Sequence, residues 1–474
     1  MTHPNDLVNH RTTQDIPQTA SVVIIGSGIS GAFAAKELHG RGIHDIVVLE
    51  AREICSGATG RNGGHCQPLC YDQLAEVGEF ELKNIAYLSG LIKHNDIKCD
   101  FSPFPDGGCH AYFSQELFGS VKAKIMAMKH NVPHLASLIH VIEDPVKLAD
   151  LKIPTAIGAV LQEKAAALHP YKLVTYIWSK LFSDTNLNLQ TTTPVTSISK
   201  ASSSPTSRIW TVHTPRGGIN TAHVLLATNA YTAHLLPSFG GLIVPVQGQM
   251  SALKPTAHAL QYPLQHDYGF RGIMEQDHEE DDYLVQRPVN TGGEFMFGGG
   301  RVVAKNAAVG VSDDSYVDER VRMYLRRMLP KLMDIYGKHS DKTEEIEKLP
   351  EKYTAIEKEG EERDMEPLAE WTGIMGYSRD GRPWVGGVPG MDGVWVCAGY
   401  TGHGMPNTSL CGRHVASLVA ADVKGQDWRE VEKEAVKSKD IPESYVLSQE
   451  RMEKARELQE IKGNVAETLE KTFC

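Results

Sequence analysis

The sequence predicts a two-domain α/β fold. A short apolar strand, a helix and a second apolar strand follow one another near the N-terminus, which is the pattern of a parallel βαβ unit. Further short apolar runs at Ala222–Ala227 and Val394–Ala398 are typical of buried strands that could extend the same sheet. Between them, alternating strands and turn residues predict a second, mixed sheet. A chain of 474 residues is long enough to build both cores.

The first βαβ unit is predicted from residue type and spacing. Ser21–Gly26 is an apolar, β-branched run and therefore a buried strand. Ile29–Arg41 has helical spacing with small alanines for packing, and Ile46–Glu50 is the second apolar strand. The strand and the helix are joined by Gly26–Gly31, a GxGxxG sequence. We therefore expect a parallel sheet with a glycine turn at the carboxyl end of its first strand.

The glycine turn predicts a dinucleotide site. Gly26 permits the tight turn, Gly28 lets a pyrophosphate approach the backbone, and Gly31 allows the helix to pack closely on the strand. The helix N-terminus adds N–H groups and a positive dipole end that favour phosphate. Glu50 ends the second strand, where an acid accepts a ribose hydroxyl and disfavours a 2′-phosphate. The sequence thus predicts a Rossmann-like FAD/NAD(P)-binding domain.

The remaining elements follow from periodicity and turn residues. Further helices are predicted at Tyr71–Asn95, Gln115–Asp150, Leu168–Phe182, Asp318–Tyr336 and Asn407–Val423. Further strands are predicted at Gly107–Phe113, Leu187–Ser199, Arg208–Thr214, Ala222–Ala227, Tyr283–Gln286, Glu294–Gly298 and Val394–Ala398. Asp341–Glu366 is heavily charged and predicts a solvated insertion, and the tail after Pro442 predicts a charged helix without a strong apolar face.

These elements predict a discontinuous cofactor domain. We assign residues 1–100, 155–245 and 366–440 to the FAD/NAD(P)-binding domain. Residues 101–154 and 246–365 form the mixed-sheet α+β substrate domain. Residues 441–474 form the charged C-terminal helical tail.

Composition excludes several classes of function. The net charge of −11 disfavours nucleic acid and anionic lipid as partners. No window approaches the ~20 apolar residues of a membrane span. The eight cysteines show no CxxC and no zinc spacing, so we expect reduced thiols and no metal site. The N-terminus is polar and lacks an apolar signal region, and a cytoplasmic location is therefore expected.

A second loop of small and hydroxyl-bearing residues, Ser56–His65, follows the first βαβ unit. With it the chain resembles the FAD-dependent amine and amino-acid oxidoreductases, the D-amino-acid oxidase family. Gly57–Gly64 is most similar to γ-glutamylputrescine oxidoreductase-like members. Later segments resemble family landmarks in the family order, namely Thr193–Val195, Ala227–Ala230, Pro245–Gln249, Trp371–Gly373, Asp380–Pro383 and Gly399–Gly404.

The resemblance implies noncovalent FAD, with the flavin ring held by the Gly399–Gly404 loop. A reduced flavin carries negative charge near N1 and the C2 carbonyl, which the N-terminus of the following helix would stabilise. The candidate cofactor-binding residues are Gly26, Ser27, Gly28, Ile29, Ser30, Gly31, Glu50, Ala51, Arg52, Gly57, Ala58, Thr59, Arg61, Asn62, Gly63, Gly64, His65, Val195, Ala227, Thr228, Asn229, Gly248, Gly373, Gly402, His403, Gly404 and Met405. A covalent link through His65 is the alternative.

The resemblance also implies a reaction. A C–N bond of an amine or amino acid is oxidised to an imine by hydride transfer to flavin, and oxygen is the expected acceptor, giving hydrogen peroxide. His403 as a flavin contact, Tyr268 as an aromatic pocket wall and Arg287 as a carboxylate partner are the candidate catalytic residues. The partner is thus a small-molecule amine or amino acid, and the sequence leaves the oligomeric state open.

Two departures from the family pattern limit the substrate. No arginine occurs in Gly373–Tyr377, where amino-acid oxidases of this kind carry one for the substrate carboxylate. Arg271, Arg287 or Arg301 could replace it, and otherwise an amine or a larger substrate is favoured. No lysine lies between Arg271 and Arg301 to help oxygen react, so a dehydrogenase stays open.

Two other functions compete with this interpretation. The enzyme could act on a cyclic amine of a biosynthetic pathway. Alternatively, the chain could be a non-catalytic flavin-binding regulatory protein, with the charged tail and Asp341–Glu366 as its contact surfaces.

Overall fold

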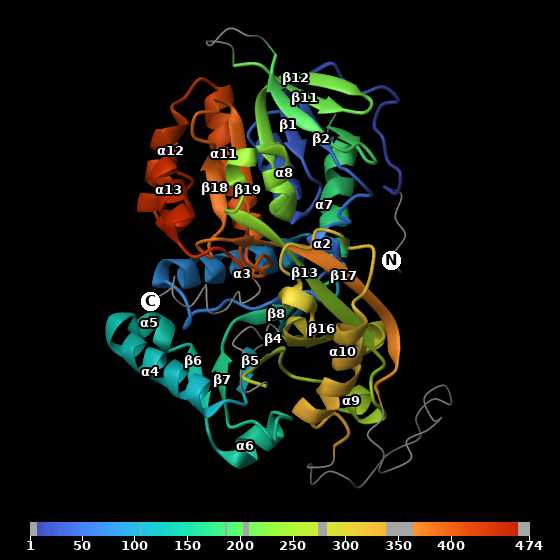
Figure 1. The fold of residues 1–474 in the computed structure, drawn as a ribbon, viewed down its shortest axis with the longest axis vertical. Helices are drawn as coiled ribbons and strands as arrows, with labels where there is room; N and C mark the ends of the chain where they lie inside the picture. Colours follow the sequence, from blue (N-terminus) through green and yellow to red (C-terminus); the bar gives the residue numbers. More distant parts are fainter. Residues whose placement is uncertain are drawn as a thin grey trace.

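The computed structural model describes residues 7–104, 106–184, 187–201, 208–273, 282–337 and 364–462. In this part of the chain the strands form a large sheet in the upper half of Figure 1, a second large sheet below it and a small sheet between them. No helix of the described residues is long and apolar enough to span a bilayer. The predicted combination of a mainly parallel and a mixed sheet is confirmed.

The first sheet is the predicted cofactor-binding sheet. Strands β12, β1, β2 and β9 run parallel, and β19 pairs in parallel with β12. β10, β11 and β18 are antiparallel to their neighbours. The strands are β1 (Thr19–Ile25), β2 (Ile46–Leu49), β9 (Asn188–Gln190), β10 (Ser197–Lys200), β11 (Trp210–Thr214), β12 (Gly217–Leu226), β18 (Trp384–Gly387) and β19 (Val394–Ala398). The parallel strands are buried on both faces, as their continuous apolar runs predict.

Helices cover both faces of this sheet. One apolar core packs beneath α1 (Ile29–Gly40), α3 (Ala75–His94), α7 (Pro170–Asp184) and α11 (Thr408–Val423). The short helices are α2 (Ala58–Arg61) before the small sheet, α8 (Thr232–Leu235), α12 (Trp428–Lys437) beside α11, and α13 (Gln449–Glu457). α13 is charged, as predicted, and it packs on the opposite face of this sheet through Met452 and Ala455.

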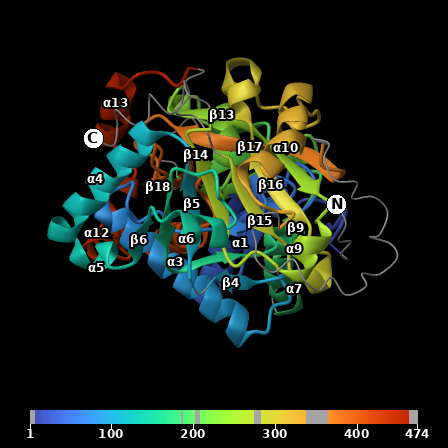
Figure 2. The same ribbon diagram turned by 90° about the horizontal axis from the view of Figure 1, so that it is seen from below.

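The second sheet is mixed, as predicted. Its order is β17-β13-β16-β15-β14-β5-β7-β6, with only β14 and β5 parallel among the pairs in this order. The strands are β5 (Gly108–Tyr112), β6 (Ile139–Ile142), β7 (Gly158–Gln162), β13 (Ile243–Leu253), β14 (Tyr268–Arg271), β15 (Tyr283–Gln286), β16 (Phe295–Gly299) and β17 (Pro367–Ser378). The helices around it are α4 (Gln115–Asn131), α5 (Pro133–Ala136), α6 (Pro145–Asp150), α9 (Ala257–Gln261) and α10 (Glu319–Leu332), and Figure 2 shows this side from below. The small sheet joins β3 (His65–Cys66), β8 (Ala165–Ala167) and β4 (Ser102–Phe104).

Three sequence expectations concern this domain. β7 and β17, which fall within the segments assigned to the FAD/NAD(P)-binding domain, pair with strands of the second sheet. The helical stretch predicted at Gln115–Asp150 is broken, because β6 pairs with β7 at the sheet edge. The predicted insertion at Asp341–Glu366 falls almost wholly outside the described residues.

Candidate active site

A cavity of about 930 Å³ lies between the two large sheets. It begins at the glycine turn and reaches β14 and α4 of the second domain. Its walls include the candidates Gly26, Ser27, Gly28, Ile29, Ser30, Glu50, Ala51, Arg52, Gly57, Ala58, Thr59, Asn62, His65, Val195, Ala227, Thr228, Asn229, Gly402, His403, Gly404 and Met405. The sequence thus located most of one wall, which is assembled from segments far apart in the chain.

The glycine turn has the predicted geometry. Gly26 has a φ of +106°, and a Cβ there would lie 2.6 Å from the carbonyl oxygen of Ala227. A Cβ at Gly31 would lie 2.1 Å from the carbonyl oxygen of Gly26. Helix α1 begins after Gly28, which offers no side chain to cap the helix. Tight backbone, a bare helix N-terminus and the cavity beside them fit the pyrophosphate of a dinucleotide.

Glu50 lies at the carboxyl end of β2, on the cavity wall. Its Oε2 accepts hydrogen bonds from the backbone N (3.0 Å) and Oγ (2.6 Å) of Ser27, and its Oε1 accepts one from the backbone N of Arg52 (3.0 Å). A carboxylate offers about four acceptor positions, so a ribose hydroxyl can still donate to it. Glu50 therefore also ties the end of β2 to the glycine turn.

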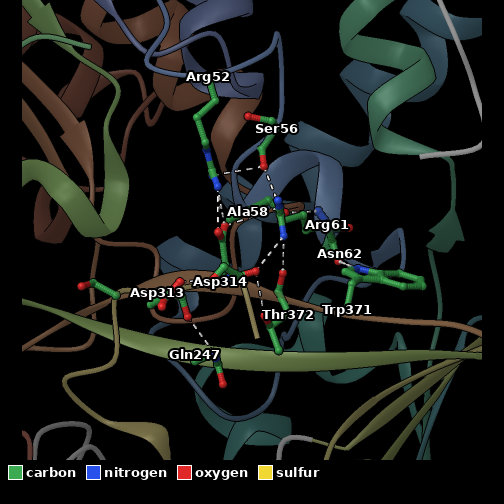
Figure 3. A network of polar contacts seen from close by, with 12 residues as sticks. Arg52, Ser56, Ala58, Arg61, Asn62, Gln247, Asp313, Asp314, Trp371 and Thr372 are labelled. Carbon is green, nitrogen blue, oxygen red and sulfur yellow. Dashed lines mark hydrogen bonds and ion pairs between the residues drawn. The ribbon is translucent and has the colours of Figure 1, made fainter. Parts of the chain in front are cut away.

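Arg61 and Gly373 lie where α2 meets β17 and are not among the residues that line the cavity. Figure 3 shows the polar contacts of Arg61. The Arg61 guanidinium donates to the carbonyl oxygens of Ser56 (2.7 Å) and Thr372 (2.9 Å). The indole of Trp371 donates back to the Arg61 carbonyl (2.6 Å), and a Cβ at Gly373 would touch the Arg61 side chain at 3.1 Å. In the structure Arg61 and Gly373 fasten α2 to β17, and their contact with the cofactor stays a prediction.

Four other glycine candidates also lie behind the cavity wall. A Cβ at Gly64 would lie 1.8 Å from the carbonyl oxygen of Leu168, and one at Gly63 or Gly248 would lie 2.9 Å from a methionine side chain. With Gly31, which packs on Gly26, these residues permit close packing rather than line the cavity. These positions need a small residue because neighbouring backbone or side-chain atoms lie where a Cβ would stand.

Tyr268 and Arg287, two of the candidate catalytic residues, do not line the cavity. Tyr268 is 1% exposed in the core of the second domain, and its hydroxyl donates to the carbonyl of Leu151 at 2.9 Å. Arg287 is held by Glu294 (3.0 Å) and Asp100 (3.4 Å). Both residues therefore have structural partners away from the reaction site.

Arg271 and Arg301, the two alternatives to Arg287, do line the cavity. Arg271 ends β14, and Arg301 is 4% exposed with its guanidinium 5.1 Å from the centre of the Tyr377 ring. Tyr283 lies on the same wall and donates its hydroxyl to the thioether of Met250 at 2.9 Å. Positive charge and aromatic surface thus meet at the end of the cavity that belongs to the second domain.

His65 lies on the wall beside a buried acid. Its Nε2 is 3.0 Å from the Gln67 Oε1, and its Nδ1 is 3.3 Å from Oδ2 of Asp267. Burial lowers the pKa of His65 to about 3 and raises the pKa of Asp267 well above its usual range. Among the seven described cysteines none lines the cavity. His65 therefore remains the residue to test for a covalent link, and it has partners near both nitrogens.

His403 is positioned by Glu81, a residue that the sequence interpretation missed. The His403 Nε2 lies 3.1 Å from Oε2 of Glu81, which is completely buried on α3. A signal was available, because Val77, Glu81, Asn84 and Leu88 form one buried stripe with 4-3-4 spacing. A carboxylate on the buried face of a helix indicates a buried partner.

The family model "FAD dependent oxidoreductase" matches residues 21–418. A glycine oxidase of Pseudomonas aeruginosa is 23% identical over 84% of this chain and 94% of its own length. The γ-glutamylputrescine oxidoreductase of Escherichia coli is 22% identical, over 90% of this chain and 88% of its own.

Solved structures show the same fold. Glycine oxidase from Geobacillus kaustophilus superposes with a TM-score of 0.65 at 18% identity, covering 86% of this chain and 95% of that one. L-proline dehydrogenase from P. horikoshii gives a TM-score of 0.64 at 19% identity, covering 88% and 99%. The glycine turn, the bare helix end and the family match agree with one another. The chain belongs to the FAD-dependent oxidoreductase family, and its cofactor is FAD.

Proposed function

We propose that the protein oxidises a C–N bond of an amine or amino acid to an imine, and that its preferred substrates carry a carboxylate. The observation that carries the substrate class is the presence of Arg271 and Arg301 on the wall of the cavity that begins at the FAD turn. Guanidinium groups supply fixed, planar pairs of donors that suit a carboxylate. The sequence alone favours an amine or a larger substrate, because no arginine occurs near Met375.

The walls of the cavity support an oxidation that excludes water. Bound FAD supplies a two-electron acceptor for a hydride from the carbon beside the nitrogen. Apolar and aromatic side chains surround the second-domain end of the cavity, among them Leu69, Tyr112 and Ile374. They bury the apolar part of a substrate, while the arginines fix its carboxylate and so orient the C–N bond.

The electron acceptor is proposed to be oxygen, with hydrogen peroxide as product. Lys124 is the lysine that lines the cavity in the described residues, and it is paired with Asp72 at 2.7 Å near α4. No lysine of the described lining therefore stands free beside the FAD turn to help oxygen react. A dehydrogenase that passes its electrons to another acceptor is the alternative outcome of the test below.

An anaerobic panel of matched amines tests this function. Each pair consists of an N-alkylglycine and the same amine without its carboxylate, with cyclic amines added. We expect the carboxylated member to bleach the visible flavin absorbance at the lower concentration. Replacing Arg271 or Arg301 by Met should reduce the preference for the carboxylated member over its partner amine by about tenfold or more. The reason is that a charge-assisted hydrogen bond contributes ~1.5–3 kcal/mol.

Two results would decide against the proposal. If no amine bleaches the flavin, the enzyme interpretation fails and the regulatory alternative stands. If both members of each pair work equally well, the carboxylate assignment fails. Admitting oxygen afterwards and assaying peroxide separates an oxidase from a dehydrogenase.

A further inference from the structure

Glu81 is a completely buried acidic residue beside the cavity. The side chain is 0% exposed, and its oxygens accept hydrogen bonds from Leu69 N (2.8 Å), Gln73 Nε2 (2.9 Å), Asn407 Nδ2 (2.7 Å) and His403 Nε2 (3.1 Å). These donors come from the loop before α3, from the Gly399–Gly404 loop and from the start of α11. The fold thus brings three separate segments to one buried carboxylate.

His403 is the one donor in this set that can become a cation. Leu69 contributes a backbone N–H, and Gln73 and Asn407 contribute neutral amides. No lysine or arginine of the described residues donates to Glu81. Since a carboxylate only accepts, the hydrogen between the two side chains belongs to His403 Nε2, and His403 Nδ1 carries the lone pair. A proton added at Nδ1 would be balanced by the buried negative charge.

We propose that His403 accepts the proton of the substrate ammonium at Nδ1 and that Glu81 is the positioning residue that fixes its tautomer and stabilises its charged form. The proposal rests on the proposed amine oxidation and deepens it. His403 lines the cavity, and 35% of its side chain is exposed. An amine in the cavity can therefore reach its ring.

The proton balance is simple. An N–H bond of the ammonium breaks and an N–H bond at His403 Nδ1 forms, which leaves the amine neutral with its lone pair free. That lone pair can then form the C=N bond as a hydride leaves the neighbouring carbon for FAD. The His403 proton passes to water after the product leaves. Without this step a protonated amine would have no electron pair to expel the hydride.

The neighbouring charged groups do not compete for this proton. Burial lowers the pKa of His65 to about 3 and the pKa of His110 well below its usual range, so both are neutral near pH 7. Arg271 faces both rings, and burial raises the pKa of Asp267 well above its usual range, so that acid holds its proton. Glu81 is thus the anion that faces His403 directly.

Three variants of the holoenzyme test the proposal. Glu81→Gln removes the charge at constant size, and His403→Gln removes the acceptor on the cavity wall. Glu79→Gln is the matched control on the same helix, because Glu79 pairs with Lys439 (3.0 Å) and His134 (2.9 Å) away from the cavity. Anaerobic flavin reduction by the best amine of the panel is followed as a function of pH.

The expected result is a change of the pH profile as well as of rate. Near pH 7 both site variants should reduce flavin roughly 100-fold more slowly, the low end of acid–base contributions. The deficit should shrink toward high pH, and for an amine of lower pKa, because the substrate then arrives neutral. A loss of folding would lower the rate equally at every pH. The Glu79→Gln profile should match the wild type.

A spectroscopic measurement checks the positioning role without turnover. In ¹⁵N-histidine spectra of the holoenzyme, the signal that disappears in His403→Gln should be that of the Nε2–H tautomer. In Glu81→Gln the His403 signal should become that of a mixture of both tautomers. The proposal would be overturned if both site variants had the pH profile of the wild type, or if His403 of the wild type were the Nδ1–H tautomer. If no amine reduces wild-type flavin, the proposed function fails and this inference falls with it.

Discussion

Glu50 shows how one carboxylate serves both the fold and the cofactor. It joins Ser27 and the Arg52 backbone N in the structure and faces the cavity where the ribose is expected. Sequence spacing was enough to select this residue, because the length of a βαβ unit fixes where the second strand ends. It could not select Glu81, whose partners come from three segments that only the fold brings together.

Replacing Glu50 by Ala should weaken FAD binding by about 1–3 kcal/mol, the scale of a lost charged hydrogen bond. Fluorescence titration of the apoprotein with FAD measures the change. Glu53→Ala serves as control, because its carboxylate binds Asn9 N at 2.8 Å and it does not line the cavity. Equal affinity in Glu50→Ala and wild type would remove the ribose assignment.

Glu432 on α12 should make stability depend on pH. Burial raises its pKa from 4.5 to about 7, so the folded state keeps a proton that the unfolded chain releases between these values. Its contribution to stability is complete below pH 4.5 and is lost as the pH rises to about 7. Glu432→Gln should therefore melt at a higher temperature than wild type at about pH 8 and at a similar one at about pH 5. Identical Tm differences at both pH values would contradict this linkage.

At the scale of elements, the crossing of α1 and α11 places the two FAD loops together. A Cβ at Gly412 would lie 2.5 Å from the carbonyl oxygen of Ser30, so the two helices touch through backbone. The helices themselves were predictable from their periodicity. Their crossing was not, because nothing in either segment specifies the other as its partner.

Gly412→Ala should destabilise the protein by about 1–3 kcal/mol, the usual cost of overpacking. Urea unfolding measures it. Gly90→Ala on α3 provides the opposite case, because nothing lies within 4 Å of the added methyl group. That exchange should stabilise by ~0.5–1 kcal/mol through helix propensity. Destabilisation of equal size in both variants would argue against a contact at the crossing.

The segment of residues 309–318 runs from the second domain to the FAD wall, where Ser312, Asp313 and Asp314 line the cavity. Figure 3 shows Asp313 and Asp314 with their partners. The Asp314 carboxylate pairs with Arg52 at 2.7 Å, and Gln247 holds the carbonyl of Asp313 at 2.7 Å. Arg52 was predicted as a cofactor contact, and the structure shows that its guanidinium also fastens this segment.

Asp314→Asn should therefore speed FAD release about fivefold, since a partly exposed ion pair contributes up to ~1 kcal/mol. Dilution of the holoenzyme with detection of free flavin fluorescence measures the rate. Glu366→Gln is the control, because it breaks a similar 2.8 Å pair with Lys254 that lies away from the cavity. An unchanged release rate in Asp314→Asn would show that the segment does not retain FAD.

At the scale of the whole molecule, the family landmarks gave the domain architecture but not its strand-level boundaries. β17 follows the charged insertion directly, yet it pairs with β13 along its length and so joins the second sheet. Pairing between strands more than a hundred residues apart leaves no local signal. The same limit explains Tyr268 and Arg287, whose residue types suit a pocket while their partners lie elsewhere.

The central claim is that the protein oxidises an amine bound in this cavity, with FAD as the hydride acceptor. Anaerobic single-turnover mixing tests it most directly, using a carboxylated amine with hydrogen or deuterium on the carbon beside nitrogen. The account predicts complete bleaching of the flavin. The rate of bleaching should be several-fold lower with the deuterated amine, because the bond to that hydrogen breaks as the hydride leaves. A flavin that keeps its visible spectrum with every amine, linear or cyclic, would contradict it.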